Sequence, residues 1–195
     1  ILVHSGAYGT TIVVDKSLTI TGVADDVAVF GTLTVNQLAP TDRVVVRGVS
    51  DGFFQALEIE VDDCAGNVWI EDCVLESLEI SNSSNVVVLD CEVAADLAPF
   101  QNSNLPGMKS TDSMVYVHGT TLRGGFGHPG DCILGTFFGE TGPAGAWIRG
   151  GTAFFFSSVL EGGSGGDLDI TPPTCTSCVN GTGGPGLRIT EGAEV

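Results

Sequence analysis

Basic residues are scarce in this chain. Seven Lys and Arg stand against 24 Asp and Glu, which gives a formal charge of −17. A charge of this sign and size repels the phosphates of nucleic acids, so we expect no nucleic-acid partner. Long hydrophobic runs are missing too, and no stretch approaches the roughly 20 apolar residues that a membrane helix needs. We therefore expect no membrane span.

The given sequence begins with Ile1, and no basic segment followed by an apolar one precedes its first apolar run. Either a signal has been removed or the chain is part of a longer solenoid. Nothing in the sequence resembles an interdomain linker, and 43% hydrophobic residues are enough for a continuous core. We expect residues 1–195 to form a single domain. Little Lys with much Gly and Thr suits a secreted or cell-surface protein.

What the chain does contain is a short repeat. Ala65–Leu75 (AGNVWIEDCVL) and Ser83–Val93 (SSNVVVLDCEV) nearly superimpose at an offset of 18 residues. A repeat of this length, with β-branched runs broken by Asn, Asp, Ser and Gly, is too short and too poor in helix formers for a helical repeat. It predicts one coil of a parallel β-helix, in which equivalent residues of successive coils stack about 4.8 Å apart.

Further segments fit the same template. At roughly 18 to 25 residues per coil, the chain predicts about eight or nine coils with three loop excursions. The excursions are Ala94–Asp112, Gly124–Ala146 and Gly162–Gly186. If they leave from one corner, they wall a groove or form an adhesive surface. The strand-like runs are Ile1–His4, Ile12–Val14, Leu18–Ile20, Val27–Val29, Leu33–Val35, Arg43–Asp51, Ser113–Gly125, Thr152–Gly163 and Gly186–Val195.

Two segments carry a resemblance to a known group. Asn67–Cys73 (NVWIEDC) resembles the strand motif of pectate lyases, and Ile1–Gly22 is similar to the first coil of pectin methylesterases. The resemblance implies the pectin-lyase-like group of single-stranded right-handed β-helices. Right-handedness also agrees with the crossover preference of parallel strands.

The catalytic signatures of that group are missing. Glu71-Asp72 stands where the lyases have Asp-His, their Arg-x-x-Pro-x-x-Arg segment is absent, and Thr10 replaces the esterase Glu. A divergent lyase site would combine carboxylates with a cationic base. The candidates for such a site are the carboxylates of Glu71, Asp72 and Asp90, together with Arg47 one coil earlier. The structural alternative makes Asp72 and Asp90 corner residues that accept backbone hydrogen bonds.

Calcium is a weaker expectation. Asp72 and Asp90 stack one coil apart, while Asp131 and Asp167 belong to glycine-rich segments similar to calcium-binding nonapeptides, which normally occur in tandem. Glu58 and Glu79, in the related runs ALEI and SLEI, predict an outward acidic face that a cation could bridge or that water alone solvates. We expect no bound cofactor apart from this calcium candidate.

Among the six cysteines, Cys73 and Cys91 occupy equivalent places in the two matching coils. They predict stacked inward side chains, either as a disulfide or as a reduced ladder. Cys175 and Cys178 form a C-x-x-C in a Pro/Gly-rich loop, where a disulfide fits better than a zinc site, since further paired ligands are missing.

Aromatic residues of the excursions could stack on sugars or pack against the coils. They are Phe100, Phe126, Phe137 and Phe138, whereas Ala153–Phe156 (AFFF) is interpreted as strand core. The sequence thus favours a structural or adhesive β-helix module that is not an enzyme, with polysaccharide binding and end-to-end stacking into an extracellular filament as possible partnerships. The alternative is a lyase-like enzyme acting on acidic polysaccharide with a divergent carboxylate site.

Overall fold

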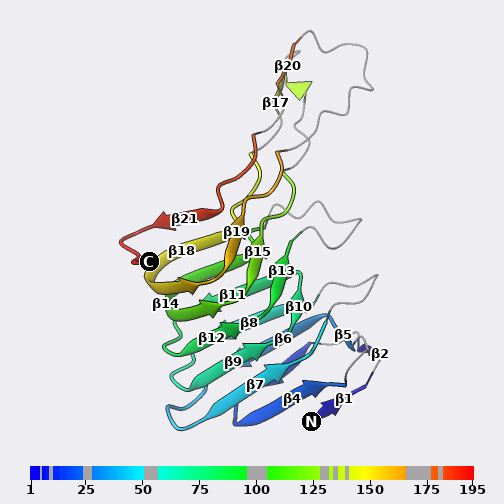
Figure 1. The fold of residues 1–195 in the computed structure, drawn as a ribbon, viewed down its shortest axis with the longest axis vertical. Helices are drawn as coiled ribbons and strands as arrows, with labels where there is room; N and C mark the ends of the chain where they lie inside the picture. Colours follow the sequence, from blue (N-terminus) through cyan, green and yellow to red (C-terminus); the bar gives the residue numbers. More distant parts are fainter. Residues whose placement is uncertain are drawn as a thin grey trace.

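The computed structural model describes residues 1–4, 6–8, 11–23, 28–50, 57–95, 105–127, 132–133, 136–138, 141–165, 177–179 and 182–195. Within these ranges the protein is all-β, and its main sheet is a curled layer of parallel strands (Figure 1). This confirms the predicted all-β class and is compatible with a parallel β-helix. No described helix is long and apolar enough to cross a membrane.

The main sheet has twelve strands and bends into two arms, which β14 and β18 join. The first arm contains β1 (Leu2–Val3), β4 (Leu18–Gly22), β7 (Arg43–Arg47), β9 (Asn67–Glu71), β12 (Val86–Leu89) and the second halves of β14 (Met108–His118) and β18 (Ala146–Phe156). The second arm contains β3 (Ile12–Val14), β6 (Thr32–Asn36), β8 (Glu58–Asp62), β11 (Ser77–Ser81), the first halves of β14 and β18, and β21 (Leu187–Thr190).

Smaller sheets complete the described structure. A side sheet contains β10 (Val74–Leu75), β13 (Glu92–Ala94), β15 (Thr121–Arg123) and β19 (Val159–Glu161), all parallel. β2 (Gly6–Tyr8) pairs with β5 (Ala28–Phe30). β16 (Cys132–Ile133), β17 (Thr136–Phe138) and β20 (Ser177–Val179) form a third sheet; β17 and β20 lie beyond the stacked strands in Figure 1. From β9 to β15 the chain visits the first arm, the side sheet and the second arm in turn.

The core is built from columns of side chains in register. Val44, Val68, Val86 and Val115 stack along the first arm, and Leu33, Ile59, Leu78 and Met108 stack along the second. All eight are at most 1% exposed. Residues between them point outward, because successive strand residues face opposite sides of the sheet. Burying each large side chain of this kind contributes about 1.5–3 kcal/mol before entropy costs.

The corners between sheets use left-handed backbone. Asp63, Asn82 and Asp112 have φ of 51°, 48° and 48° at the corner from the second arm to the first. Asp and Asn tolerate this region better than other L-residues because their short side chains bond locally. At the other end of the first arm, Asp72 and Asp90 have φ of 51° and 49°. The Asp that recurs in the repeat, at Asp72 and Asp90, is therefore a corner residue.

Cys73 and Cys91 lie on successive rungs at the second of these corners, directly before the paired residues Val74 and Glu92. The predicted stacking is therefore confirmed. Both are buried free thiols, as is Cys64. A hydrogen bond with Cys73, together with burial, raises the pKa of Cys91, which keeps this thiol protonated and unreactive. Cys175 and the side chain of Cys178 lie outside the described residues.

The three excursions leave and return at the same edges. They start after the paired strands β13, β15 and β19, and they return into β14, β18 and β21, which pair in order. Their predicted boundary is wrong at one place: Met108–Thr111 is a strand paired with β11, not part of a loop. Alternation of buried Met108 and Ser110 with outward Lys109 was hidden by the polar composition of this segment.

Corner hydroxyls continue the hydrogen-bond ladder. The backbone N–H of Ser83 donates to Ser113 Oγ at 3.0 Å, and this hydroxyl donates to the carbonyl of Thr111 at 2.7 Å. Ser113→Ala leaves the buried N–H of Ser83 unpaired, so we expect a loss of about 1–3 kcal/mol in the free energy of unfolding by urea titration. Ser84→Ala, on the exposed neighbour, should change it by less than about 0.5 kcal/mol. Equal effects of both changes would contradict the ladder.

Candidate functional site

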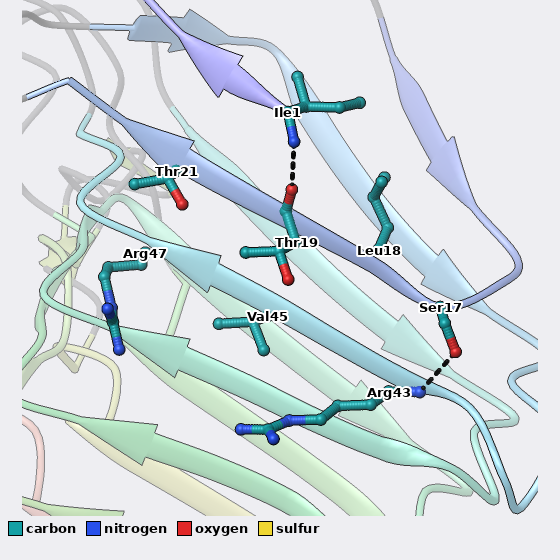
Figure 2. A pocket seen from close by; sticks show the side chains of 8 residues that line it. All are labelled: Ile1, Ser17, Leu18, Thr19, Thr21, Arg43, Val45 and Arg47. Carbon is teal, nitrogen blue, oxygen red and sulfur yellow. Dashed lines mark hydrogen bonds between the residues drawn. The ribbon is translucent and has the colours of Figure 1, made fainter.

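A groove of about 600 Å³ lies on the outer face of the first arm, over β4 and β7 (Figure 2). Strand alternation forms it: Val44 and Val46 point into the core, so Arg43, Val45 and Arg47 point outward. Its remaining wall is formed by Ile1, Ser17, Leu18, Thr19 and Thr21. The groove thus combines two guanidinium groups with a row of hydroxyls.

Backbone contacts hold the wall of the groove in place. Ser17 Oγ accepts the backbone N–H of Arg43 at 3.1 Å and donates to Asp42 Oδ1 at 2.7 Å. The backbone nitrogen of Ile1 donates to the carbonyl of Thr19 at 2.6 Å, which Figure 2 shows as a dashed line. These bonds fix β4 against its neighbours, so the hydroxyls of Thr19 and Thr21 keep their spacing along the strand.

Arg43 is held flat but has no carboxylate partner among the described residues. Its guanidinium lies 5.0 Å from the centre of the Trp69 ring, a cation–π arrangement, and no ion pair involving it occurs in the described chain. Guanidinium donors oriented in this way match the oxygens of a carboxylate or sulfate. Lys16 and Arg188 are the other described cations that form no ion pair.

The predicted lyase residues come together only in part. Arg47 Nη2 contacts Glu71 Oε2 at 2.6 Å, one rung away. The hydrogen bond and the charge of Glu71 raise the pKa of Arg47 above its ordinary value. A catalytic base needs the opposite shift, because it must release its proton near the working pH. Asp72 and Asp90 stand at the neighbouring corner, where their N–H groups donate to the carbonyls of Leu89 and His118.

Calcium ligation has little geometric support. In the part of the chain that the structure describes, no three His, Cys, Asp or Glu side chains gather closely enough to hold a metal ion. Asp72 and Asp90 therefore do not form a carboxylate cage in that part of the chain. The other two candidates, Asp131 and Asp167, lie outside the described residues.

An acidic strip on the second arm differs from its predicted register. Glu79 lies opposite Glu60, and Glu58 lies opposite Ser77, so the alignment of ALEI with SLEI is displaced by two residues. A displacement by two residues leaves each side chain on the same face of the sheet, so the prediction that Glu58 and Glu79 point outward does not depend on the register. Burial, followed by the charges of Glu60 and Glu79, raises the pKa of Glu58 above its ordinary value.

An aromatic column extends the groove along the first arm. Val45 pairs in register with Trp69, and the same outward column continues through Val87 to Tyr116 and Phe154. The rings of Tyr116 and Phe154 stack with centres 4.9 Å apart. The facing sides of the two rings are therefore covered, while Tyr116 remains 38% exposed.

The sequence interpretation of the aromatic residues was partly wrong. In the run predicted as strand core, Ala153 is buried, but Phe154 faces outward and Phe156 is 53% exposed. The outward position of Phe154 could have been predicted from the alternation of inward and outward residues that Ala153–Phe155 shares with Val115–Val117. Phe126 is exposed, as its candidacy requires. Phe100 and the side chains of Phe137 and Phe138 lie outside the described residues.

Comparisons with known proteins give no relative: no family model, no curated protein and no solved structure matches the chain. The resemblance to the pectin-lyase-like group therefore depends on the two sequence segments alone.

The corner role of Asp90 is testable by its backbone. Asp90→Val places a β-branched residue at φ 49°, which we expect to lower the free energy of unfolding by about 1–2 kcal/mol. Asp90→Asn removes the same charge but keeps left-handed tolerance, so it should be nearly neutral. Urea titration of both variants checks this. Equal losses for Asp90→Asn and Asp90→Val would contradict this, because they would show that the carboxylate matters and the left-handed backbone does not.

The raised pKa of Glu58 predicts a pH-dependent effect. Folding favours the neutral form of Glu58, because its pKa is higher in the folded than in the unfolded protein. The protein is therefore most stable, with respect to this group, below the pKa of the unfolded state. It loses this stability as the pH rises through the pKa of the folded state. Glu58→Gln, always neutral, should therefore stabilise the protein at pH 7 by less than about 1 kcal/mol. This stabilisation by Glu58→Gln should vanish at about pH 4. Urea titrations at both pH values test it, with Glu92→Gln on the side sheet as the control. A stabilisation that persists unchanged at the lower pH would refute the prediction.

Proposed function

We propose that the protein is a secreted or cell-surface adhesive module that binds an acidic polysaccharide along the outer face of the first arm without cleaving it. The observation that carries this proposal is the groove itself, in which Arg43 and Arg47 are four residues apart on β7 beside the hydroxyls of Ser17, Thr19 and Thr21. Uronate carboxylates and sugar hydroxyls match these donors in type.

The balance of charges supports one decisive contact. The net charge of −17 repels any polyanion at long range, although screening limits this repulsion to about 8 Å at physiological salt. Four of the described cations are already neutralised by a carboxylate on a neighbouring rung; they are Arg47, Lys109, Arg123 and Arg149. Three described cations form no such pair: Lys16, Arg43 and Arg188. Of these three, Arg43 lines the groove, so affinity for an acidic sugar depends strongly on it.

Binding without cleavage follows from the roles of the candidate catalytic groups. Arg47 is paired with Glu71, which favours its charged form, and Asp72 and Asp90 serve the corner backbone. The Arg47 guanidinium and the backbone N–H groups of Asp72 and Asp90 thus hold neighbouring rungs together. This argues against the lyase-like alternative, whose base and metal ligands would have to come from other residues.

The proposal includes the finer architecture. The order of arms and side sheet, repeated with parallel register from β4 through β18, supports a single-stranded right-handed β-helix. Such a rod would present the groove and the aromatic column as one continuous face. The number of coils, predicted at about eight or nine, and end-to-end stacking of copies into a filament stay predictions.

Binding to polygalacturonate, measured by affinity gel electrophoresis, tests the role of Arg43. The protein should be retarded by the polyanion, and Arg43→Gln should weaken the interaction about ten-fold or more, because a charge-assisted hydrogen bond is lost. Arg149→Gln is the matched control: it removes the same charge from an exposed arginine of the second arm, which is paired with Glu191. It should bind like the unchanged protein.

Several outcomes would contradict the proposal. Equal weakening by Arg43→Gln and Arg149→Gln would indicate an effect of net charge rather than a site. Absence of retardation in any acidic polysaccharide would remove the adhesive role. Release of unsaturated uronides, followed by ultraviolet absorbance, would favour the lyase-like alternative instead.

A further inference from the structure

A second hollow, with a volume of about 550 Å³, lies on the outer face of the second arm where the three excursions return. It is lined by Pro106, Thr141, Gly142, Pro143, Ala144, Trp147, Pro185 and Arg188. Each excursion contributes a proline, and the strands β18 and β21 contribute the two large side chains. The volume falls in the range of about 300–1,000 Å³ that is usual for small-molecule sites.

The shape of this hollow follows from a repeated triplet. Gly107, Gly145 and Gly186 stand directly before the paired residues Met108, Ala146 and Leu187. A Cβ at any of them would lie between 2.3 and 2.6 Å from a carbonyl oxygen of β15 or β19, so only glycine fits there. The preceding Pro106, Ala144 and Pro185 are thereby set side by side as a rigid apolar wall.

Arg188 supplies the only described charge that lines this wall. Its guanidinium lies 4.7 Å from the centre of the Trp147 ring, and no carboxylate of the described chain forms an ion pair with it. The indole N–H of Trp147 donates to Thr190 Oγ1 at 3.0 Å, which fixes the ring beneath the guanidinium. An oriented cation beside a flat apolar wall matches a ligand that combines a carboxylate with a ring.

We propose that this hollow, the Trp147 pocket, binds a single ring-bearing carboxylate, with Arg188 holding the carboxylate and the three prolines contacting the ring. Arg43 on the first arm also lies over a tryptophan, but its groove is an open, hydroxyl-lined surface suited to a chain of sugars. The Trp147 pocket is more enclosed and more apolar, so it selects a compact ligand. This inference is independent of the proposed function, because the two sites lie on different arms and share no residue.

The test follows the indole N–H resonances of the two tryptophans by NMR, assigned with Trp69→Phe. Benzoate and glucuronate are the probes; one carries an aromatic ring and the other a sugar ring. Benzyl alcohol, which has a ring but no carboxylate, is the neutral control. We expect saturable shifts of the Trp147 resonance with benzoate, glucuronate or both, and the response of each probe identifies the source of the ligand.

Variants make the outcome decisive. Arg188→Gln should weaken binding about ten-fold or more, and Arg188→Lys should weaken it less, since charge is kept but the planar fork is lost. Arg149→Gln and Arg43→Gln should leave the Trp147 response unchanged. The inference is overturned if neither benzoate nor glucuronate shifts the Trp147 resonance, or if benzyl alcohol binds as tightly as benzoate. It is also overturned if the Arg188→Gln variant binds these probes like the unchanged protein. A result from Arg43→Gln in polygalacturonate bears only on the first-arm groove, so the two proposals fail separately.

Discussion

Parallel pairing in register between successive rungs is the constraint on which the rest of this structure depends. Each strand donates to and accepts from its neighbours along the stack, and this repeats equivalent residues at a fixed spacing. Inward columns such as Val44, Val68 and Val86 become a core. Outward columns become ion-pair ladders, an acidic strip or an aromatic row. Side-chain function in this protein is therefore a property of columns rather than of single strands.

Charge is distributed according to the same rule. Arg47, Lys109, Arg123 and Arg149 each contact a carboxylate on an adjacent rung, where exposure to solvent keeps every pair weak. Their main consequence is to neutralise most of the few cations. Arg43 and Arg188 differ from them: each lies over a tryptophan, and each lines a hollow. Two hollow-lining arginines without an ion-pair partner in the described part of so acidic a chain are the strongest reason to look for anionic ligands.

Sequence reasoning located the repeat well and the sites poorly. Ile12–Val14 was found with its observed bounds, and the stacking of Cys73 on Cys91 was predicted from their equivalent positions. Met108–Thr111 was missed because its polar outward residues hid a buried alternation. The two Arg–Trp pairs were missed for a different reason. Arg43 and Trp69 are far apart in the chain, and only the pairing of β7 with β9 brings them together.

The sequence by itself determined the all-β class and pointed to Asp72 and Asp90 as corner residues, because these depend on local backbone preference and on a short repeat. Tertiary structure alone decided which outward residues become neighbours. A shift of two residues leaves the facing of a strand unchanged, as for Glu58 and Glu79, yet it changes every partner in the column. Grooves and pockets depend on those partners, and the register that selects them is fixed only when all the strands are stacked.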